Sequence, residues 1–368
     1  MSKTWKTLMI GAAVIAGMTG GASAQPAQDW QTVFDARVPA LLSEHDVPAA
    51  GIAIVNADGV VYSGVWGEAR PGEAATADTL FNVASVAKTI ASETMLSLVE
   101  AGEFGLDDPM APYWIDPDIV DDPRAQTLTP RHALGHSTGF HNWRRMSESG
   151  QLEIRFDPGS MSDYSGEGYE YLARFAEQVT GQDYAALVHS RLLEPRGIDG
   201  VVVGRDPGLA EHYAWSKRPD GSFVAADFTV PASAADDLYI TVGGYGAFMA
   251  GVIRGEGLSA PLVTQRETIQ FDFASRFCSI PVFTDICPDA VGFALYGSVF
   301  VWDGEPVIIQ GGGDIGERAL SFYLPERDLG VIIATNGANG AKLFEPLVRE
   351  IYANENLLTF LRLQAQQG

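Results

Sequence analysis

Residues 79–102 read TLFNVASVAKTIASETMLSLVEAG, and the apolar positions after Ser85 recur at helical spacing. Gly102 is a typical helix C-cap, so the segment predicts a helix over residues 85–101. Ser85 then opens the helix, and Lys88 follows one turn later on the same face. We therefore expect these two side chains to meet at the N-terminus of a mostly apolar helix.

The Ser-x-x-Lys pair has the chemistry of a nucleophile and its activator. A hydroxyl is a poor nucleophile until a base takes its proton. A lysine kept partly neutral by burial can act as that base, or can lower the pKa of a neighbour. Backbone N–H groups left free at a helix N-terminus can also hold a developing oxyanion.

The pair alone is a weak signal, because Ser85 could simply cap the helix and Lys88 could be a solvated side chain. Lysine, however, is scarce in this chain. Beyond residue 24 only Lys88, Lys217 and Lys342 remain. One lysine in three therefore falls at this spacing, on a helix that is otherwise apolar nearby, which favours a functional role.

Three later segments continue the pattern. They are Leu134-Gly-His-Ser-Thr-Gly-Phe140, Phe156-Asp-Pro-Gly-Ser-Met-Ser-Asp-Tyr164-Ser-Gly166 and Gln310-Gly-Gly-Gly-Asp-Ile-Gly316. With the Ser-x-x-Lys pair, they resemble the motifs of serine β-lactamases and penicillin-binding proteins. The surrounding sequence is similar to the branch that contains class C β-lactamases, D-alanyl carboxypeptidases, D-aminopeptidases and β-lactamase-type carboxylesterases. The resemblance covers nearly the whole chain after residue 24, in the family's order.

This resemblance implies a serine hydrolase that works through an acyl-enzyme. Ser85 would be the nucleophile, Lys88 its activating partner and Tyr164 the proton relay to the leaving group; whether Tyr164 or Lys88 is the base stays open. The oxyanion hole would combine the N–H of Ser85 with that of a residue near Gly313. The expected substrate-binding residues are Gln310, Gly312 and Gly313. We expect a small-molecule ester, amide or peptide substrate, and neither a cofactor nor a metal.

Two departures from the family pattern shift the expected substrate. Gly166 stands where the Tyr-x-Asn motif has asparagine, and a lost hydrogen bond of this kind costs on the order of 1–3 kcal/mol. Gln310 stands where the family has a cation, so a substrate carboxylate is disfavoured unless Arg318 or another arginine substitutes. The expectation moves towards an esterase or amidase. A D-Ala-type peptidase, a β-lactamase and a non-catalytic recognition protein remain the alternatives.

The other segments predict an α+β fold of the β-lactamase/transpeptidase-like kind. Helices are expected over residues 29–44 and 169–180 and, as one final helix, from about residue 342 into the 360s. A hairpin is expected over residues 50–66, and further strands over 292–302, 306–310, 319–323 and 329–335. Strands near both ends with helices between them suggest one antiparallel sheet built from both chain ends, flanked by helices, with an inserted, mainly helical lobe.

We expect one catalytic domain over residues 25–368. Its α/β lobe would comprise about 29–102 and 240–368, and its helical lobe about 103–239.

The first 24 residues predict a cleavable signal peptide, since two lysines precede an apolar run and Ala22-Ser23-Ala24 has the small residues that signal peptidase needs. We therefore expect cleavage after Ala24, a periplasmic or secreted protein, and no membrane anchor in the mature chain. In an oxidising compartment, Cys278 and Cys287 are expected to form a disulfide. A formal net charge of -23 argues against a nucleic-acid partner. The oligomeric state stays open.

Two other interpretations concern the segment around residue 135. Gly135-His-Ser137-Thr-Gly139 fits the Gly-x-Ser-x-Gly nucleophile elbow, but an elbow needs a buried strand before it, and the sequence before it predicts a helix start. His132 and His136 have the spacing of a helical metal pair, with His141 beyond, but no glutamate of the zincin pattern lies between them. We rank both below the Ser85 site.

Overall fold

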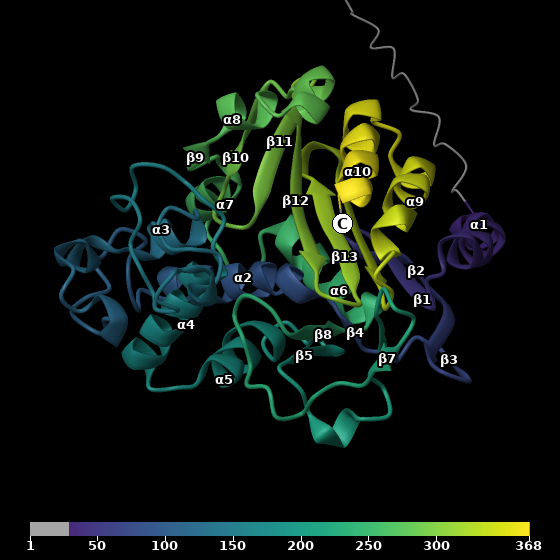
Figure 1. The fold of residues 1–368 in the computed structure, drawn as a ribbon, viewed down its shortest axis with the longest axis horizontal. Coiled ribbons are helices and arrows are strands. Elements are labelled where there is room, and N and C mark those ends of the chain that lie inside the picture. Colours follow the sequence, from purple (N-terminus) through teal and green to yellow (C-terminus); the bar gives the residue numbers. More distant parts are fainter. Residues whose placement is uncertain (1–28, 368) are drawn as a thin grey trace, which may run out of the picture.

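The computed structural model describes residues 29–367 (Figure 1), so the predicted signal peptide lies outside the described residues. Its centre is an antiparallel sheet of nine strands in the order β3-β2-β1-β14-β13-β12-β11-β10-β9. Strands from opposite ends of the chain meet in the middle, where β1 (Ala49–Asn56) pairs with β14 (Leu329–Thr335). The prediction of one antiparallel sheet built from both chain ends is confirmed.

The other strands of the sheet are β2 (Gly59–Arg70), β3 (Glu73–Ala74), β9 (Phe271–Asp272), β10 (Ala290–Phe293), β11 (Ser298–Trp302), β12 (Glu305–Gly313) and β13 (Arg318–Leu324). The helices are α1 (Trp30–His45), α2 (Ala87–Glu100), α3 (Pro130–Leu134), α4 (Gly166–Thr180), α5 (Tyr184–Val188), α6 (Val242–Arg254), α7 (Ala260–Glu267), α8 (Ala274–Cys278), α9 (Phe344–Ile351) and α10 (Glu355–Gln367).

Helices cover both faces of the sheet (Figure 1). Alternation along β1 separates the two layers, because successive side chains of a strand point to opposite faces. Ala53 and Val55 pack into the core formed with α2 and α6. Ile52 and Ile54 pack into the core formed with α1, α9 and α10. Helix α2, which follows Ser85, is therefore enclosed between the sheet and the inserted lobe.

The inserted lobe carries α3, α4 and α5 together with short strands. A small sheet joins β4 (Phe81–Asn82), β8 (Leu238–Ile240) and β5 (Val201–Val203), and a separate pair is formed by β6 (Ser216–Lys217) and β7 (Phe223–Val224). Because β4 lies directly before Ser85 and β8 ends the lobe, this pairing connects the turn at Ser85 to the last part of the inserted segment.

Two predicted elements were wrong in their boundaries. The strand expected over residues 292–302 is two strands, because a turn closed by the Ala294 N–H and the Gly297 carbonyl (2.9 Å) reverses the chain. The single final helix is two helices, α9 and α10. The chain leaves helical geometry at Tyr352, and the Asn354 side chain then accepts the N–H of Leu357 at 3.0 Å, as a helix N-cap does.

The predicted disulfide is confirmed, since Cys278 at the end of α8 is bonded to Cys287. A span of the membrane would need a longer and more apolar helix than any found over residues 29–367.

Candidate active site

Ser85 lies on a 3₁₀ turn, Ala84–Val86, that leads from β4 into α2. The residue before it, Ala84, has a left-handed φ of 46°, a conformation that is costly for a residue with a Cβ. The Asn82 side chain stabilises this turn by accepting the Ala84 N–H at 2.9 Å. The helix expected to begin at Ser85 therefore begins as a 3₁₀ turn, and its α-helical part starts at Ala87.

Strand β12 passes directly beside this turn. A Cβ at Gly312 would lie 2.0 Å from the carbonyl oxygen of Val83, so only glycine allows the two backbones to come this close. Gly311 has open space around its Cβ position. The glycine run that the sequence presents at residues 311–313 thus has a structural cause at Gly312, and it places the predicted substrate-binding strand against the predicted nucleophile.

Lys88 is fully buried and in contact with Ser85. Its Nζ donates to the Ser85 Oγ at 3.0 Å and to the carbonyl oxygen of Ala235 at 2.7 Å. Nζ also lies 4.9 Å from the centroid of the Tyr164 ring. Among residues 29–367, no carboxylate oxygen lies within 4.0 Å of this amine. The amine is held by neutral acceptors at the distance required for proton exchange with the serine hydroxyl.

Tyr164, whose ring lies beside the Lys88 amine, is also in contact with Gln310. Gln310 is 6% exposed, and its Nε2 donates to the Tyr164 hydroxyl at 3.4 Å and to the Gly311 carbonyl at 2.8 Å. The glutamine that replaces the family's cation is therefore occupied with the predicted proton relay and with its own strand. The structure brings Ser85, Lys88, Tyr164 and Gln310 together, although they come from three separate segments.

His136 supports the ring of Tyr164. The two ring centroids are 4.6 Å apart, and the His136 Nδ1 accepts the N–H of Ser165 at 3.1 Å. Burial, followed by the nearby charge of Lys88, lowers the pKa of His136 to about 3. The imidazole is therefore neutral at ordinary pH, and it fixes the backbone on one side of Tyr164.

The geometry around residue 135 differs from what a nucleophile elbow at Ser137 or a histidine metal site would need. Ser137 is fully buried, donates to the carbonyl of His132 at 3.4 Å, and follows the short helix α3 rather than a strand. Within residues 29–367, no group of three or more histidine, cysteine, aspartate or glutamate side chains is arranged to hold a metal ion.

Gly166 is the first residue of α4, and its Cβ position is already crowded. A Cβ there would lie 3.0 Å from Cη2 of Trp143 and 3.1 Å from the carbonyl oxygen of Asn142. The Trp143 indole and the Asn142 carbonyl therefore leave little room for a side chain at residue 166.

A cavity of about 720 Å³ opens beside Tyr164, Gln310 and Gly312. Its apolar wall includes Phe273, Phe293, Phe300, Leu320, Phe344 and Phe360. Two arginines also line it. Arg318 donates through Nη1 to the carbonyls of Asp314 and Glu317, and Arg276 lies 3.7 Å from Asp163. Tyr164 and Gln310 thus border a mostly apolar cavity, and the two arginines that line it already have partners.

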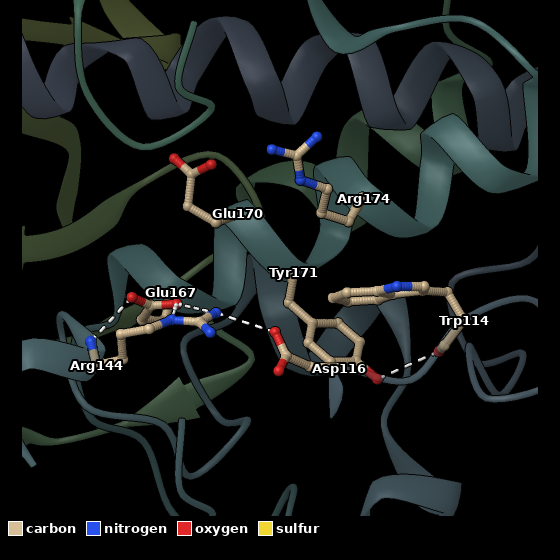
Figure 2. Close-up of a pocket in the computed structure, with 7 residues that line it drawn as sticks. All are labelled: Trp114, Asp116, Arg144, Glu167, Glu170, Tyr171 and Arg174. Atoms are coloured by element: carbon tan, nitrogen blue, oxygen red, sulfur yellow. Dashed lines mark hydrogen bonds and ion pairs between the residues drawn. The ribbon is translucent and has the colours of Figure 1, made fainter. Parts of the chain in front are cut away.

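A second cavity, of about 350 Å³, lies in the helical lobe beside α4 (Figure 2). Arg144 donates to Asp116 at 3.0 Å and to Glu167 at 2.9 Å on its lower side. Glu170 comes from the same helix but points away from these ion pairs, towards α2. No motif in the sequence marks Glu170 or the Ala235 carbonyl.

The comparisons with known proteins agree on one family. The model of the family described as Beta-lactamase matches residues 34–352. The chain is 25% identical over 350 residues to penicillin-binding protein 4 of Amycolatopsis lactamdurans, with 88% of each chain covered. It is 23% identical over 348 residues to the D-alanyl-D-alanine-carboxypeptidase/endopeptidase AmpH of Escherichia coli strain K12, covering 84% of this chain and 87% of that one.

Esterase EstB of Burkholderia gladioli is 30% identical over 188 residues, which cover 42% of this chain and 47% of the esterase. Among solved structures, the octameric penicillin-binding protein homologue from Pyrococcus abyssi superposes with a TM-score of 0.69 at 20% identity, covering 84% of this chain and 74% of that one. At this identity the structural likeness shows a shared fold.

Proposed function

The chain belongs to the β-lactamase family of serine hydrolases and penicillin-binding proteins, and we propose that it is an exported enzyme that cleaves ester or amide bonds through an acyl-enzyme on Ser85. The observation that carries this proposal is the contact of 3.0 Å between the Lys88 amine and the Ser85 hydroxyl. A buried amine with neutral acceptors as its partners is suited to exchange a proton with a nucleophile.

In the proposed reaction, the Ser85 Oγ attacks the substrate carbonyl carbon while its proton passes to Lys88 or to the Tyr164 oxygen. The tetrahedral intermediate then collapses, the bond to the leaving group breaks, and the leaving group takes up that proton. Water adds to the acyl-enzyme, assisted by the same groups in reverse, and releases the acid and Ser85. Backbone N–H groups of Ser85 and of the end of β12 are the proposed oxyanion donors.

The surroundings of Tyr164 favour an uncharged substrate. The neutral amide of Gln310 stands where the family binds a carboxylate, and the adjoining cavity of about 720 Å³ is walled mainly by apolar rings. A cavity of this size accommodates a small ligand, and its apolar wall would bury an ester or amide with a bulky apolar group. The partial similarity to esterase EstB supports the same preference.

A second candidate is a D-Ala-type peptidase or β-lactamase. Arg318 lines the same cavity as Gln310, and a carboxylate could replace one of the two carbonyls that its Nη1 now contacts. The similarity to AmpH and to penicillin-binding protein 4 supports this candidate. Export is part of the proposal, and the disulfide supports it because such bonds persist in oxidising compartments.

The test is hydrolysis of a short-chain p-nitrophenyl ester by the purified protein, with a chromogenic cephalosporin and a D-alanyl-D-alanine peptide measured in parallel. We expect ester turnover that is lost in Ser85→Ala, and slower turnover of the two carboxylate-bearing substrates. Faster cleavage of the peptide or the cephalosporin would favour the second candidate. Turnover of none of the three would favour a non-catalytic recognition protein.

A further inference from the structure

One carboxylate oxygen organises the loop that holds Lys88. The Oε1 atom of Glu170 accepts the Ser233 hydroxyl, the N–H of Ala234 at 3.1 Å and the N–H of Ala235 at 3.2 Å. The Ser233 hydroxyl oxygen in turn accepts the N–H of Ala235 at 3.1 Å and that of Asp236 at 3.0 Å. Three donors on one oxygen fix the backbone of residues 233–235 relative to α4.

The same loop provides the second acceptor of the Lys88 amine. Ala235 is fully buried, and its carbonyl oxygen accepts Nζ at 2.7 Å while its N–H is held by Glu170. Glu170 is therefore connected to Ser85 through two intermediates, the Ala235 peptide and the Lys88 amine. A shift of the 233–235 backbone would move the Lys88 amine relative to the Ser85 Oγ.

Glu170 has no part in the ion network beside it. Figure 2 shows its side chain turned away from Arg144 and Glu167, and none of the cations in residues 29–367 lies within 4.0 Å of its carboxylate. Burial raises the pKa of Glu170. Glu170 is partly exposed, and the hydrogen bonds to its carboxylate together with the nearby Lys88 offset the cost of its desolvation. A role confined to the stability of α4 would not need a carboxylate aimed at the Lys88 loop.

We propose that Glu170 is a positioning residue for Lys88, acting through the Ala235 carbonyl. The inference rests on the proposed function, because it assigns Glu170 to the proton exchange between Lys88 and Ser85. It also accounts for how a buried lysine keeps a fixed geometry without a carboxylate of its own. The loop carbonyl, held in place by Glu170, supplies the second contact.

Because all three hydrogen bonds end on Oε1, two substitutions of Glu170 separate the role of this acceptor from that of the charge. Glu170→Gln keeps a carbonyl oxygen that can accept the same three donors, whereas Glu170→Ala removes the acceptor. We expect Glu170→Ala to lose about 10²-fold in kcat with an unchanged KM, the size of effect that a small misplacement of a reacting group produces. Glu170→Gln should retain most of the wild-type kcat. Ser233→Ala removes one donor to Oε1 and the hydroxyl that accepts the N–H groups of Ala235 and Asp236, but it leaves the two backbone bonds to Glu170, so it should show a smaller loss in the same direction.

The matched control is Arg144→Leu, which breaks the ion pairs with Asp116 and Glu167 beside the same helix without touching residues 233–235. It should lower the melting temperature and leave kcat of the folded enzyme unchanged. A wild-type kcat for Glu170→Ala would overturn the proposal, as would a Glu170→Gln variant as impaired as Glu170→Ala. An equal loss of kcat in Arg144→Leu would also overturn it, because general loosening of α4 would then explain the effect.

Failure of the proposed function has a separate signature. If the wild type hydrolyses no ester, the variants are compared by the rate at which a fluorophosphonate labels Ser85, which needs the activated hydroxyl but no turnover. Slower labelling in Glu170→Ala with normal labelling in Glu170→Gln would support the positioning role, and equal rates in all variants would overturn it.

Discussion

Helix α2 carries two buried charges in very different surroundings. Lys88 and Glu93 are five residues apart and both fully buried. Glu93 lies 3.0 Å from Arg266 and 3.5 Å from Arg196, whereas the Lys88 amine, within residues 29–367, contacts a hydroxyl, a carbonyl and two aromatic rings. The charge of Glu93, at the middle of the helix, is neutralised by arginines, whereas the amine of Lys88, in the first turn, contacts the serine.

The ion pairs of Glu93 connect elements that build the core. Arg266 of α7 also contacts Glu267 at 2.6 Å and donates to the carbonyl of Val252 on α6 at 2.9 Å. The Tyr323 hydroxyl of β13 donates to Glu267 at 3.0 Å. Breaking a buried pair is costly because it leaves an uncompensated charge. We therefore interpret the role of Glu93 as structural and that of Lys88 as chemical, and this difference can be tested by substitution.

The largest expected effect is on Lys88. Lys88→Met removes the amine but roughly fills its space, so we expect turnover to fall by roughly 10³-fold or more, since the nucleophile loses its activator. The melting temperature should stay level or rise, because a buried polar group without an ion-pair partner is replaced by an apolar side chain. Kinetics on the ester and thermal unfolding of the same preparation measure both. A near-normal rate would contradict the assignment of Lys88.

The next effect concerns Tyr164. Tyr164→Phe keeps the ring beside His136 and Lys88 but removes the oxygen that Gln310 contacts, and we expect a loss of roughly 10²–10⁴-fold in kcat if this oxygen moves protons. Folding should be unchanged, since the ring packing is kept. A wild-type kcat would restrict Tyr164 to a packing role.

Substitution of Glu93 should mainly affect the stability of the fold. Glu93→Leu leaves Arg266 and Arg196 buried without their shared carboxylate, so we expect the free energy of unfolding to fall by about 3–5 kcal/mol. The kcat of the molecules that remain folded should change little. Urea unfolding and active-site titration separate the two quantities. Loss of kcat with normal stability would contradict the structural role assigned to Glu93.

The last expected effect is a pH dependence of stability at His136, close to Lys88. The pKa of His136 is lowered to about 3, so the unfolded chain binds a proton that the folded protein rejects between pH 6.5 and 3. The stability of the wild type should therefore fall by about 1.4 kcal/mol for each pH unit of acidification in that window through this group alone.

His136→Asn is the matched variant, because asparagine tolerates the left-handed φ of 56° at this position and still offers an acceptor to Ser165. Its unfolding free energy, measured from pH 8 to pH 4, should show a shallower decline on acidification than that of the wild type. Parallel curves for the two proteins would exclude His136 as the source of the dependence.

Much of the site could be predicted because it rests on local spacing. Three residues on a helix bring Ser85 and Lys88 onto one face, and the structure places their polar atoms in contact. The antiparallel sheet could be predicted for a similar reason, since β14 is an apolar run bounded by turns. Gly312 also left a signal, because the close approach of Val83 excludes a side chain there.

The remainder depends on contacts that leave no pattern in the sequence. Ala235 serves Lys88 through its carbonyl, which every residue has, and it lies 147 positions away in the chain. Glu170 occupies an ordinary position on an amphipathic helix. The turn at residues 294–297 was missed because its residues Leu295 and Tyr296 are apolar and buried, as strand residues are. The break between α9 and α10 had a signal in Asn354, which caps the second helix.

The most direct test of the central claim is to locate the covalent adduct after the protein reacts with a fluorophosphonate. Digestion and mass spectrometry of the wild type, Lys88→Met and Ser85→Ala identify the modified residue and compare its extent. We predict one adduct, on the peptide that contains Ser85, slowed in Lys88→Met and absent from Ser85→Ala. An adduct on Ser137, or one that forms equally in Ser85→Ala, would contradict the account.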